Sequence, residues 1–163
     1  MEEEKILETL RQARPAAVLS AEVSLGDAVA VIRPADLASV AAFLREAPLE
    51  LDMLLDLTCV HWPEGPDAFT MVYHFLSLRS NARLRVKAGL PAENPRIASL
   101  TGLWKNASWL EREVFDMFGV RFEGHPDLRR LLLYDGFEGH PLRKDYPLRK
   151  RQPRIPLRTP EAK

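Results

Sequence analysis

The pentapeptide Phe-Glu-Gly-His-Pro occurs twice, at residues 122–126 and 137–141, and it limits where regular secondary structure can form. Gly-His-Pro favours turns, because the residue before a proline is pushed out of the helical region of backbone space. The last 43 residues, from Arg121 onward, hold six of the chain's 13 prolines. We therefore expect residues 1–120 to form a globular domain and residues 121–163 to form an extended arm.

The first 120 residues alternate between helical and strand patterns of apolar side chains. Helical spacing occurs in residues 2–13 and again after Pro34. Strand patterns, separated by turn residues, occupy residues 16–25, 28–33, 51–59, 69–79 and 83–88. This order predicts an α+β fold with two helices on a mixed, largely antiparallel five-stranded sheet (α-β-β-α-β-β-β). A short helix and the arm follow.

Two stretches of the globular part are less regular. In the third strand the predicted buried face has one exception, Leu54, and consists of Leu51, Met53, Leu55, Leu57 and Cys59. Residues 90–108 contain two prolines and no sustained periodicity. We expect this second stretch to be a connection that is either mobile or covered by a partner.

A short helix is predicted over residues 109–118. Ser108 followed three residues later by Glu111 matches a capping box, in which each side chain bonds to a backbone N–H of the other residue. Gly119 is placed to end the helix in a left-handed conformation.

The charges on this helix need partners. Arg112 and Asp116 are four residues apart on the polar side and are predicted to pair. Glu111 falls within the apolar arc of the helix, and Glu113 lies beside it. A buried carboxylate without a partner costs several kcal/mol, so we expect ion pairs within the chain or with another chain.

Three separated blocks resemble the signature of the C subunit of proton-translocating NADH:quinone oxidoreductase, respiratory complex I. They run from Glu111 to Gly119, from Gly124 to Arg130 and from Gly139 to Leu148. The resemblance covers about a quarter of the chain, and the order of the preceding elements agrees with that family. Related membrane-bound hydrogenase complexes carry a similar subunit, which is the alternative reading.

The resemblance implies a cofactor-free, non-catalytic subunit of the peripheral arm of that complex. Its partners would be the large quinone-site subunit (D type) and the iron–sulfur subunit (B type). Electron transfer from NADH through FMN and Fe–S centres to quinone, coupled to proton translocation, would occur in other subunits. The chain would lie peripherally on the cytoplasmic side of the inner membrane and reach the membrane only through the complex.

The residues themselves agree with a peripheral position. The first ten residues, MEEEKILETL, lack the basic and apolar regions of a signal peptide. No apolar run approaches the ~20 residues that a transmembrane helix needs.

The arm also carries apolar residues that a small domain cannot easily cover, notably residues 131–134. An exposed apolar segment usually marks a protein interface, and arginine forks at its rim suit partner carboxylates. We predict the following partner-binding residues: Glu111, Arg112, Glu113, Asp116, His125, Arg129, Arg130, His140, Arg143, Lys144, Asp145 and Tyr146.

A different class of function, a stand-alone metal-dependent hydrolase, would use His125 and His140 with neighbouring carboxylates. The chain has no HExxH motif, and its single cysteine, Cys59, excludes a four-cysteine cluster within the chain. Glycine-rich loops for NAD, FMN or ATP are also missing from the sequence. We therefore favour the reading in which each histidine stabilises its own turn, with no metal site.

Nucleic-acid binding is the third class. Net charge is zero, but residues 1–120 carry −5 and residues 121–163 carry +5. The basic arm and the alternating Arg83, Arg85 and Lys87 could meet phosphates. Because the body is acidic and stacking aromatic residues are missing from the tail beyond Tyr146, we expect no nucleic-acid partner.

Overall fold

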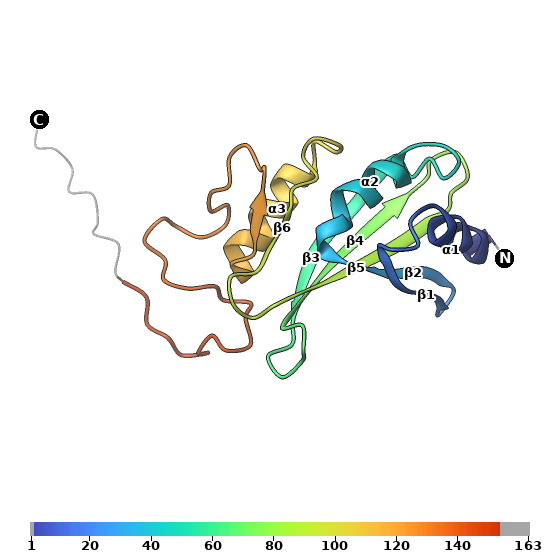
Figure 1. Cartoon of the computed structure of the whole chain (residues 1–163). Helices are drawn as coiled ribbons and strands as arrows, with labels where there is room; N and C mark the ends of the chain where they lie inside the picture. Colours follow the sequence, from blue (N-terminus) through green and yellow to red (C-terminus); the bar gives the residue numbers. More distant parts are fainter. Residues whose placement is uncertain (1, 154–163) are drawn as a thin grey trace, which may run out of the picture.

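The computed structural model, which describes residues 2–153, shows an α+β fold with three helices along one five-stranded sheet (Figure 1). The predicted fold class and order of elements are confirmed. The elements are α1 (Glu2–Ala13), β1 (Val18–Ser24), β2 (Asp27–Ile32), η1 (Pro34–Asp36), α2 (Leu37–Arg45), β3 (Met53–His61), β4 (Phe69–Leu76), β5 (Arg83–Leu90), β6 (Arg96–Ala98), α3 (Ala107–Phe118) and β7 (Arg121–Glu123).

The strand order in the large sheet is β1-β2-β5-β4-β3. All neighbouring pairs are antiparallel except β2 and β5, which are parallel, so the sheet is mixed as predicted. The β1–β2 hairpin is also confirmed. Its turn places Leu25 and Gly26 at positive φ, 54° and 88°, which is the twist that two-residue hairpin turns require.

One face of the sheet forms the core. On β5, Leu84, Val86 and Ala88 are buried beneath the helices, in one cluster with Leu10 of α1 and Leu44 of α2. The pleat sends alternate side chains of a strand to opposite faces. The predicted basic stripe of β5 therefore lies on the other face, where Arg85 pairs with Asp27 at 2.6 Å. Between residues 2 and 153, no helix is long and apolar enough to cross a membrane.

The predicted alternation in β3 is wrong in its first half. A β-bulge between Leu54 and Asp56 shifts the register against β4. An extra residue in one strand moves the following side chains to the opposite faces. As a result Leu54 is buried, whereas Met53 and Leu55 are exposed. Beyond the bulge the alternation holds, and Leu57 and Cys59 are buried as predicted.

The connection after β5 packs against its own chain, which corrects the expectation that it is mobile or covered by a partner. Strand β6 pairs in parallel with β7. Trp104 is buried, lies 5.1 Å from the ring of Phe75, and donates its indole N–H to the Asp52 carbonyl at 2.8 Å. Two strands far apart in sequence thus tie the start of the arm to the connection.

The arm begins as part of the folded body. Phe122 of β7 is buried, and Leu128 and Leu133 pack against the core. After β7 the chain continues without helix or strand to residue 153, along the end of the molecule away from the N-terminus (Figure 1). The boundary at residue 121 and the predicted role of the arm in partner binding remain predictions.

The bulge in β3 gives a test with a matched pair of leucines. Leu54→Ala should lower the free energy of unfolding by about 2–5 kcal/mol, because it opens a cavity in the core. Leu55→Ala should change it by less than about 1 kcal/mol, because Leu55 is on the exposed side. Urea denaturation of both variants measures the difference. Equal losses would contradict the position of the bulge.

Candidate functional site

Helix α3 begins earlier than predicted and without the capping box. Its N-cap is Asn106, which makes no side-chain capping bond. Glu111 turns instead toward the preceding segment, where Ser99 Oγ and the backbone N–H of Leu100 donate to it at 2.7 and 2.6 Å. The predicted end of the helix is confirmed: Gly119 has φ 80°, and its N–H donates to the Phe115 carbonyl at 2.9 Å.

Asp116, near the end of α3, is a buried carboxylate that accepts hydrogen bonds from the backbone of the arm. Its Oδ2 accepts three consecutive backbone N–H groups, from Leu131, Leu132 and Leu133, at 3.0, 2.8 and 2.9 Å. Its Oδ1 accepts from the Arg130 guanidinium at 2.7 Å. A buried carboxylate is stable only when its oxygens are hydrogen-bonded or paired. Four donors from one short segment meet that requirement for Asp116.

The predicted Arg112–Asp116 pair is therefore wrong. Helical spacing allowed it, but Asp116 is fully buried and is paired with Arg130, fourteen residues further along the chain. Arg112 donates to the backbone carbonyls of Arg129 and Arg130 at 3.2 and 3.1 Å and stacks over the Trp109 ring. Both ends of the 129–133 segment are thus held by α3.

The hydrogen bonds to Asp116 outweigh the effect of its burial on its ionisation. Burial alone raises the pKa of a carboxyl group, because it disfavours the charged form. The N–H groups of Leu131–Leu133 and the Arg130 guanidinium all favour the carboxylate, and the pKa of Asp116 lies below its usual range. The carboxylate is therefore charged at neutral pH.

His140 fixes the second Gly-His-Pro turn to the same end of α3. Its Nδ1 lies 2.8 Å from the Asp116 backbone carbonyl, which can only accept, so Nδ1 carries the proton. The ring occupies the space beside Gly119, where a Cβ atom would come within 2.7 Å of it. Gly119 thus serves two purposes: it allows the left-handed helix end, and it leaves room for the histidine. Burial lowers the pKa of His140.

His125 fixes the first Gly-His-Pro turn to the other end of α3. Its Nδ1 accepts the backbone N–H of Asp127 at 3.0 Å, and its Nε2 lies 3.2 Å from the Ser108 carbonyl. This pattern requires the proton on Nε2. The two copies of the pentapeptide therefore bind opposite ends of one helix through opposite ring nitrogens.

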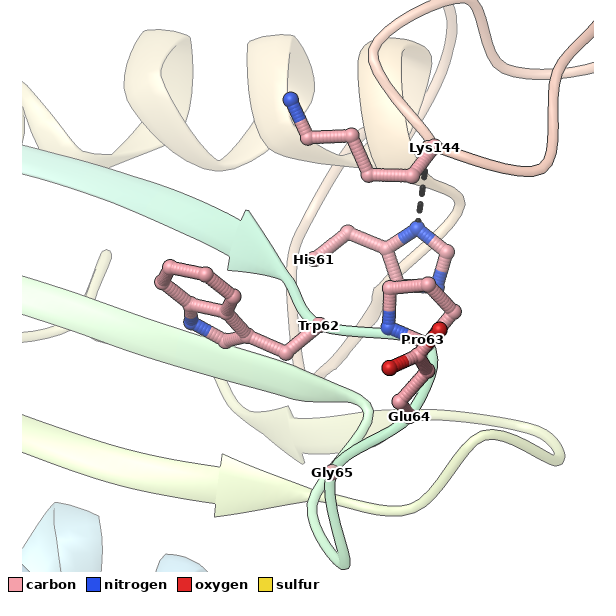
Figure 2. Close-up of a pocket in the computed structure, with 6 residues that line it drawn as sticks. All are labelled: His61, Trp62, Pro63, Glu64, Gly65 and Lys144. Atoms are coloured by element: carbon pink, nitrogen blue, oxygen red, sulfur yellow. Dashed lines mark hydrogen bonds between the residues drawn. The ribbon is translucent and has the colours of Figure 1, made fainter.

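A third histidine, His61 at the end of β3, binds the arm from the sheet side. Its Nδ1 accepts the backbone N–H of Lys144 at 2.9 Å, as Figure 2 shows. The ring stacks on Phe69, which also contacts the Arg143 guanidinium, 5.0 Å from its centroid. Burial lowers the pKa of His61, which keeps the ring neutral and able to accept this bond.

The hydrolase reading required His125 and His140 to meet with carboxylates. Within residues 2–153 no group of three or more histidine, cysteine, aspartate or glutamate side chains is arranged to hold a metal ion. Each of these two histidines is instead bonded to a backbone carbonyl of α3.

Aromatic rings organise the last described part of the arm. The Phe137 ring neighbours the rings of Tyr134 and Tyr146, at centroid distances of 5.7 and 6.1 Å. The Arg130 guanidinium lies 5.9 Å from the centroid of the Phe137 ring. The hydroxyl of Tyr146 also bonds to Gln152. This packing gives a segment without helix or strand a defined course.

The predicted partner-binding residues fall into three groups by exposure. Glu111 and Asp116 are completely enclosed by their own chain. The half-buried members of the set are Arg112, His125, Arg130, His140, Arg143 and Tyr146. Glu113, Arg129, Lys144 and Asp145 are exposed. The structure thus gathers most of the set around α3, where the enclosed members serve the fold of this chain.

Large apolar side chains are exposed beside these residues. Among the described residues of this region they are Trp62, Trp109, Leu132, Leu142 and Leu148, each at least half exposed. Trp62 and Lys144 line an apolar hollow of about 640 Å³ together with the loop that follows β3 (Figure 2). The sequence reasoning missed His61 and Trp62, because no pattern connects them with an arm eighty residues away.

Comparison with known proteins gives one consistent result. A family model described as "Respiratory-chain NADH dehydrogenase, 30 Kd subunit" matches residues 30–152. The C subunit of the NADH-quinone oxidoreductase of Rhodobacter capsulatus is 53% identical over 137 residues, which cover 83% of this chain and 68% of the relative. The corresponding C subunit of Roseiflexus sp. (strain RS-1) is 44% identical over 144 residues, covering 88% and 83%.

Two solved structures share the fold. Nqo5 in a trypsin-resistant fragment (1-134) is 31% identical with a TM-score of 0.68, covering 78% of this chain and all of that one. A chain of the membrane-bound sulfane sulfur reductase, an archaeal respiratory membrane complex, has a TM-score of 0.77 and covers 91% of this chain and 87% of its own. At 24% identity this second likeness shows the fold alone.

Asp116→Asn tests how strongly the carboxylate holds the arm. The amide keeps the size of the side chain but removes the charge opposite Arg130, and we expect a loss of about 3–5 kcal/mol in the free energy of unfolding. The control is Asp127→Asn, which alters an exposed pair with Arg129 and should cost at most about 1 kcal/mol. Hydrogen exchange should show faster exchange of the Leu131–Leu133 amides in the first variant only. Unchanged exchange there would refute the assignment.

Acid should release the arm in two stages. The lowered pKa values of His61 and His140 mean that their contribution to stability is complete above about pH 6.5 and is lost as the pH falls toward their folded values. The lowered pKa of Asp116 gives a contribution that is complete above about pH 4 and is lost only in stronger acid. As the pH falls, hydrogen exchange should therefore show that the Lys144 amide loses its protection before the amides of Leu131–Leu133 do. The reverse order would contradict these roles.

Proposed function

The chain belongs to the family of the 30 kDa subunit of respiratory-chain NADH dehydrogenase, and from this premise we propose that it is a structural subunit of the peripheral arm of such a complex. Its task is mechanical: it presents a shaped, partly apolar arm that holds neighbouring subunits in register. The chain itself contributes no redox group, and FMN and the Fe–S centres belong to partner subunits. In this proposal the FMN and Fe–S centres of the partner subunits carry the electrons from NADH to quinone.

The observation that carries the proposal is an irregular segment fixed by its own chain while its apolar side chains stay exposed. The backbone of Leu132 is bound to Asp116, yet its side chain is 62% exposed. Leu142 and Leu148 are exposed in the same way. A segment held in one shape before binding loses little conformational entropy on association. Exposed apolar side chains with a basic rim are typical of a protein interface.

The hollow beside Lys144 supports the same proposal. Trp62 is 60% exposed there and follows His61, the residue that binds the arm at Lys144 (Figure 2). Tryptophan and arginine are among the residues that most often contribute the largest share of binding energy at interfaces. Arg143, the chain neighbour of Lys144, packs its guanidinium over the Phe69 ring. We therefore propose that the partner contacted by the arm also binds at this hollow.

In this proposal the predicted partner-binding set divides between two jobs. Asp116, His125 and His140 shape the arm from inside, and Glu111 holds the segment at Ser99 and Leu100 on α3. Arg112, Arg130, Arg143 and Tyr146 serve both shape and partner contact, because they contact their own chain and stay partly exposed. The outer residues, which serve partner contact alone, are Glu113, Arg129, Lys144 and Asp145. Removal of an inner residue should then harm both fold and assembly, whereas removal of an outer one should harm assembly alone.

We assign as partners the large quinone-site subunit (D type) and the iron–sulfur subunit (B type). The chain would sit peripherally on the cytoplasmic side of the inner membrane and reach the membrane through these neighbours. The alternative is the equivalent subunit of a related membrane-bound hydrogenase complex. It shares the same mechanical role and differs in the proteins that accompany the chain.

The test alters exposed leucines of the arm without touching its internal bonds. We expect Leu132→Asp combined with Leu148→Asp to change the free energy of unfolding of the isolated chain by no more than about 0.5 kcal/mol, the usual range for surface substitutions. In cells, affinity isolation of the tagged variant from gently solubilised membranes should recover far fewer partner subunits. NADH:quinone oxidoreductase activity of the membranes should fall in parallel.

Leu78→Asp is the matched control. Leu78 is equally exposed but lies in the β4–β5 turn, at the opposite end of β4 from His61. Normal assembly of the double variant would refute the docking role of the arm. The set of proteins recovered with the wild-type chain decides between complex I and a hydrogenase-type complex, and metal analysis of the isolated chain tests the absence of a resident metal.

A further inference from the structure

Glu111 is a buried acidic group whose hydrogen-bond donors are neutral. It is completely enclosed, and it accepts from the Leu100 N–H and from Ser99 Oγ. Asp116, five residues along the same helix, is equally buried but faces the Arg130 guanidinium. Two neutral hydrogen bonds offset only part of the cost of burying a charge. The two buried carboxylates of α3 therefore differ sharply in how firmly they hold their charge.

A chain of hydroxyl groups leads from Glu111 toward the surface. Ser99 Oγ lies 2.7 Å from Glu111 Oε2 and 2.8 Å from Thr101 Oγ1. Ser99 and Thr101 are both half-buried, whereas Glu111 is enclosed. A hydroxyl can donate and accept at the same time, so this chain can reverse the direction of its bonds when the carboxyl group gains or loses a proton.

The other titratable groups that face this part of the core stay neutral. Tyr73 of β4 is fully buried, its hydroxyl has no hydrogen-bond partner among residues 2–153, and burial followed by the charge of Glu111 raises its pKa well above its usual value. Burial raises the pKa of Cys59 of β3 to about 12. Burial raises the pKa of Glu111 from 4.5 to about 7, against the opposing bonds from Ser99 and Leu100. Of these three, Glu111 alone changes charge near neutral pH.

We propose that Glu111, Ser99 and Thr101 form a proton-binding site, in which a buried carboxyl group exchanges a proton with solvent through two hydroxyl groups and thereby changes how the 99–104 segment is held on α3. This inference does not depend on the proposed assembly role.

The balance of hydrogen bonds shows how the proton acts. The ionised carboxylate accepts from both Ser99 and Leu100. A protonated carboxyl group keeps the Leu100 bond and donates its own O–H to Ser99 Oγ, which then donates to Thr101. The segment that follows is attached to α2 through Arg45, which donates to the Leu103 carbonyl at 2.7 Å, and to the strand region through Trp104. The proton site therefore lies close to where the 99–104 segment connects α3, α2 and the strand region.

The experiment is an NMR titration of the glutamate side-chain carboxyl carbons in the full chain. We expect one glutamate to titrate near pH 7 instead of near pH 4.5, and the Leu100 amide resonance to move with the same midpoint. Glu111→Gln should remove that signal. The matched control Glu113→Gln, two residues away on the exposed side of α3, should leave it unchanged.

Ser99→Ala keeps the proposal testable if the glutamine variant does not fold. It removes a bond that favours the carboxylate, so the midpoint of Glu111 should rise further, whereas Thr101→Val should move it less. A second readout follows from the sign of the shift. Because the folded pKa is raised, wild-type protein should lose stability relative to Glu111→Gln as the pH rises from about 5 to about 8. All glutamates titrating near their ordinary value, or a midpoint indifferent to Ser99→Ala, would overturn the proposal.

Discussion

The carboxylate of Asp116 fixes the path of the chain after α3. Backbone N–H groups must find acceptors when they leave water, and helices and strands usually provide them. Here one side chain accepts three consecutive N–H groups and a guanidinium, so residues 130–133 need neither kind of element. The same residue also offers its backbone carbonyl to His140. An irregular arm is thereby given a single course by one position on a helix.

The three arm-binding histidines act through hydrogen bonds to the backbone. His61 and His125 each use an unprotonated nitrogen to accept a backbone N–H, while His140 donates to a carbonyl. Their bonds join the arm to β3 and to both ends of α3. Because these bonds run from side chain to backbone, they depend little on the identity of the side chains that the arm exposes. The exposed side chains of the arm can therefore change to match a partner without altering the course of its backbone.

The sequence was informative where local rules decide the structure. Alternation and helical spacing located the sheet strands and helices, and Gly119 ended α3 as its position indicated. The errors lie where distant groups intervene. Leu54 is buried because a bulge changes the register, and Asp116 pairs with Arg130 and not with its helical neighbour Arg112. Glu111 was recognised as lying on the apolar side, but its partners Ser99 and Leu100 come from a segment that carried no pattern.

The single parallel pairing in the sheet bears on the order in which the chain folds. Strands β3, β4 and β5 follow one another as antiparallel hairpins, so their contacts close short loops. Pairing of β2 with β5 joins residues such as Ala28 and Leu84, which more than fifty residues separate. The entropy lost on closing a loop grows with its length, and distant pairings slow folding. Loop closure therefore favours a β3–β5 meander that forms first and then receives the β1–β2 hairpin at its open edge.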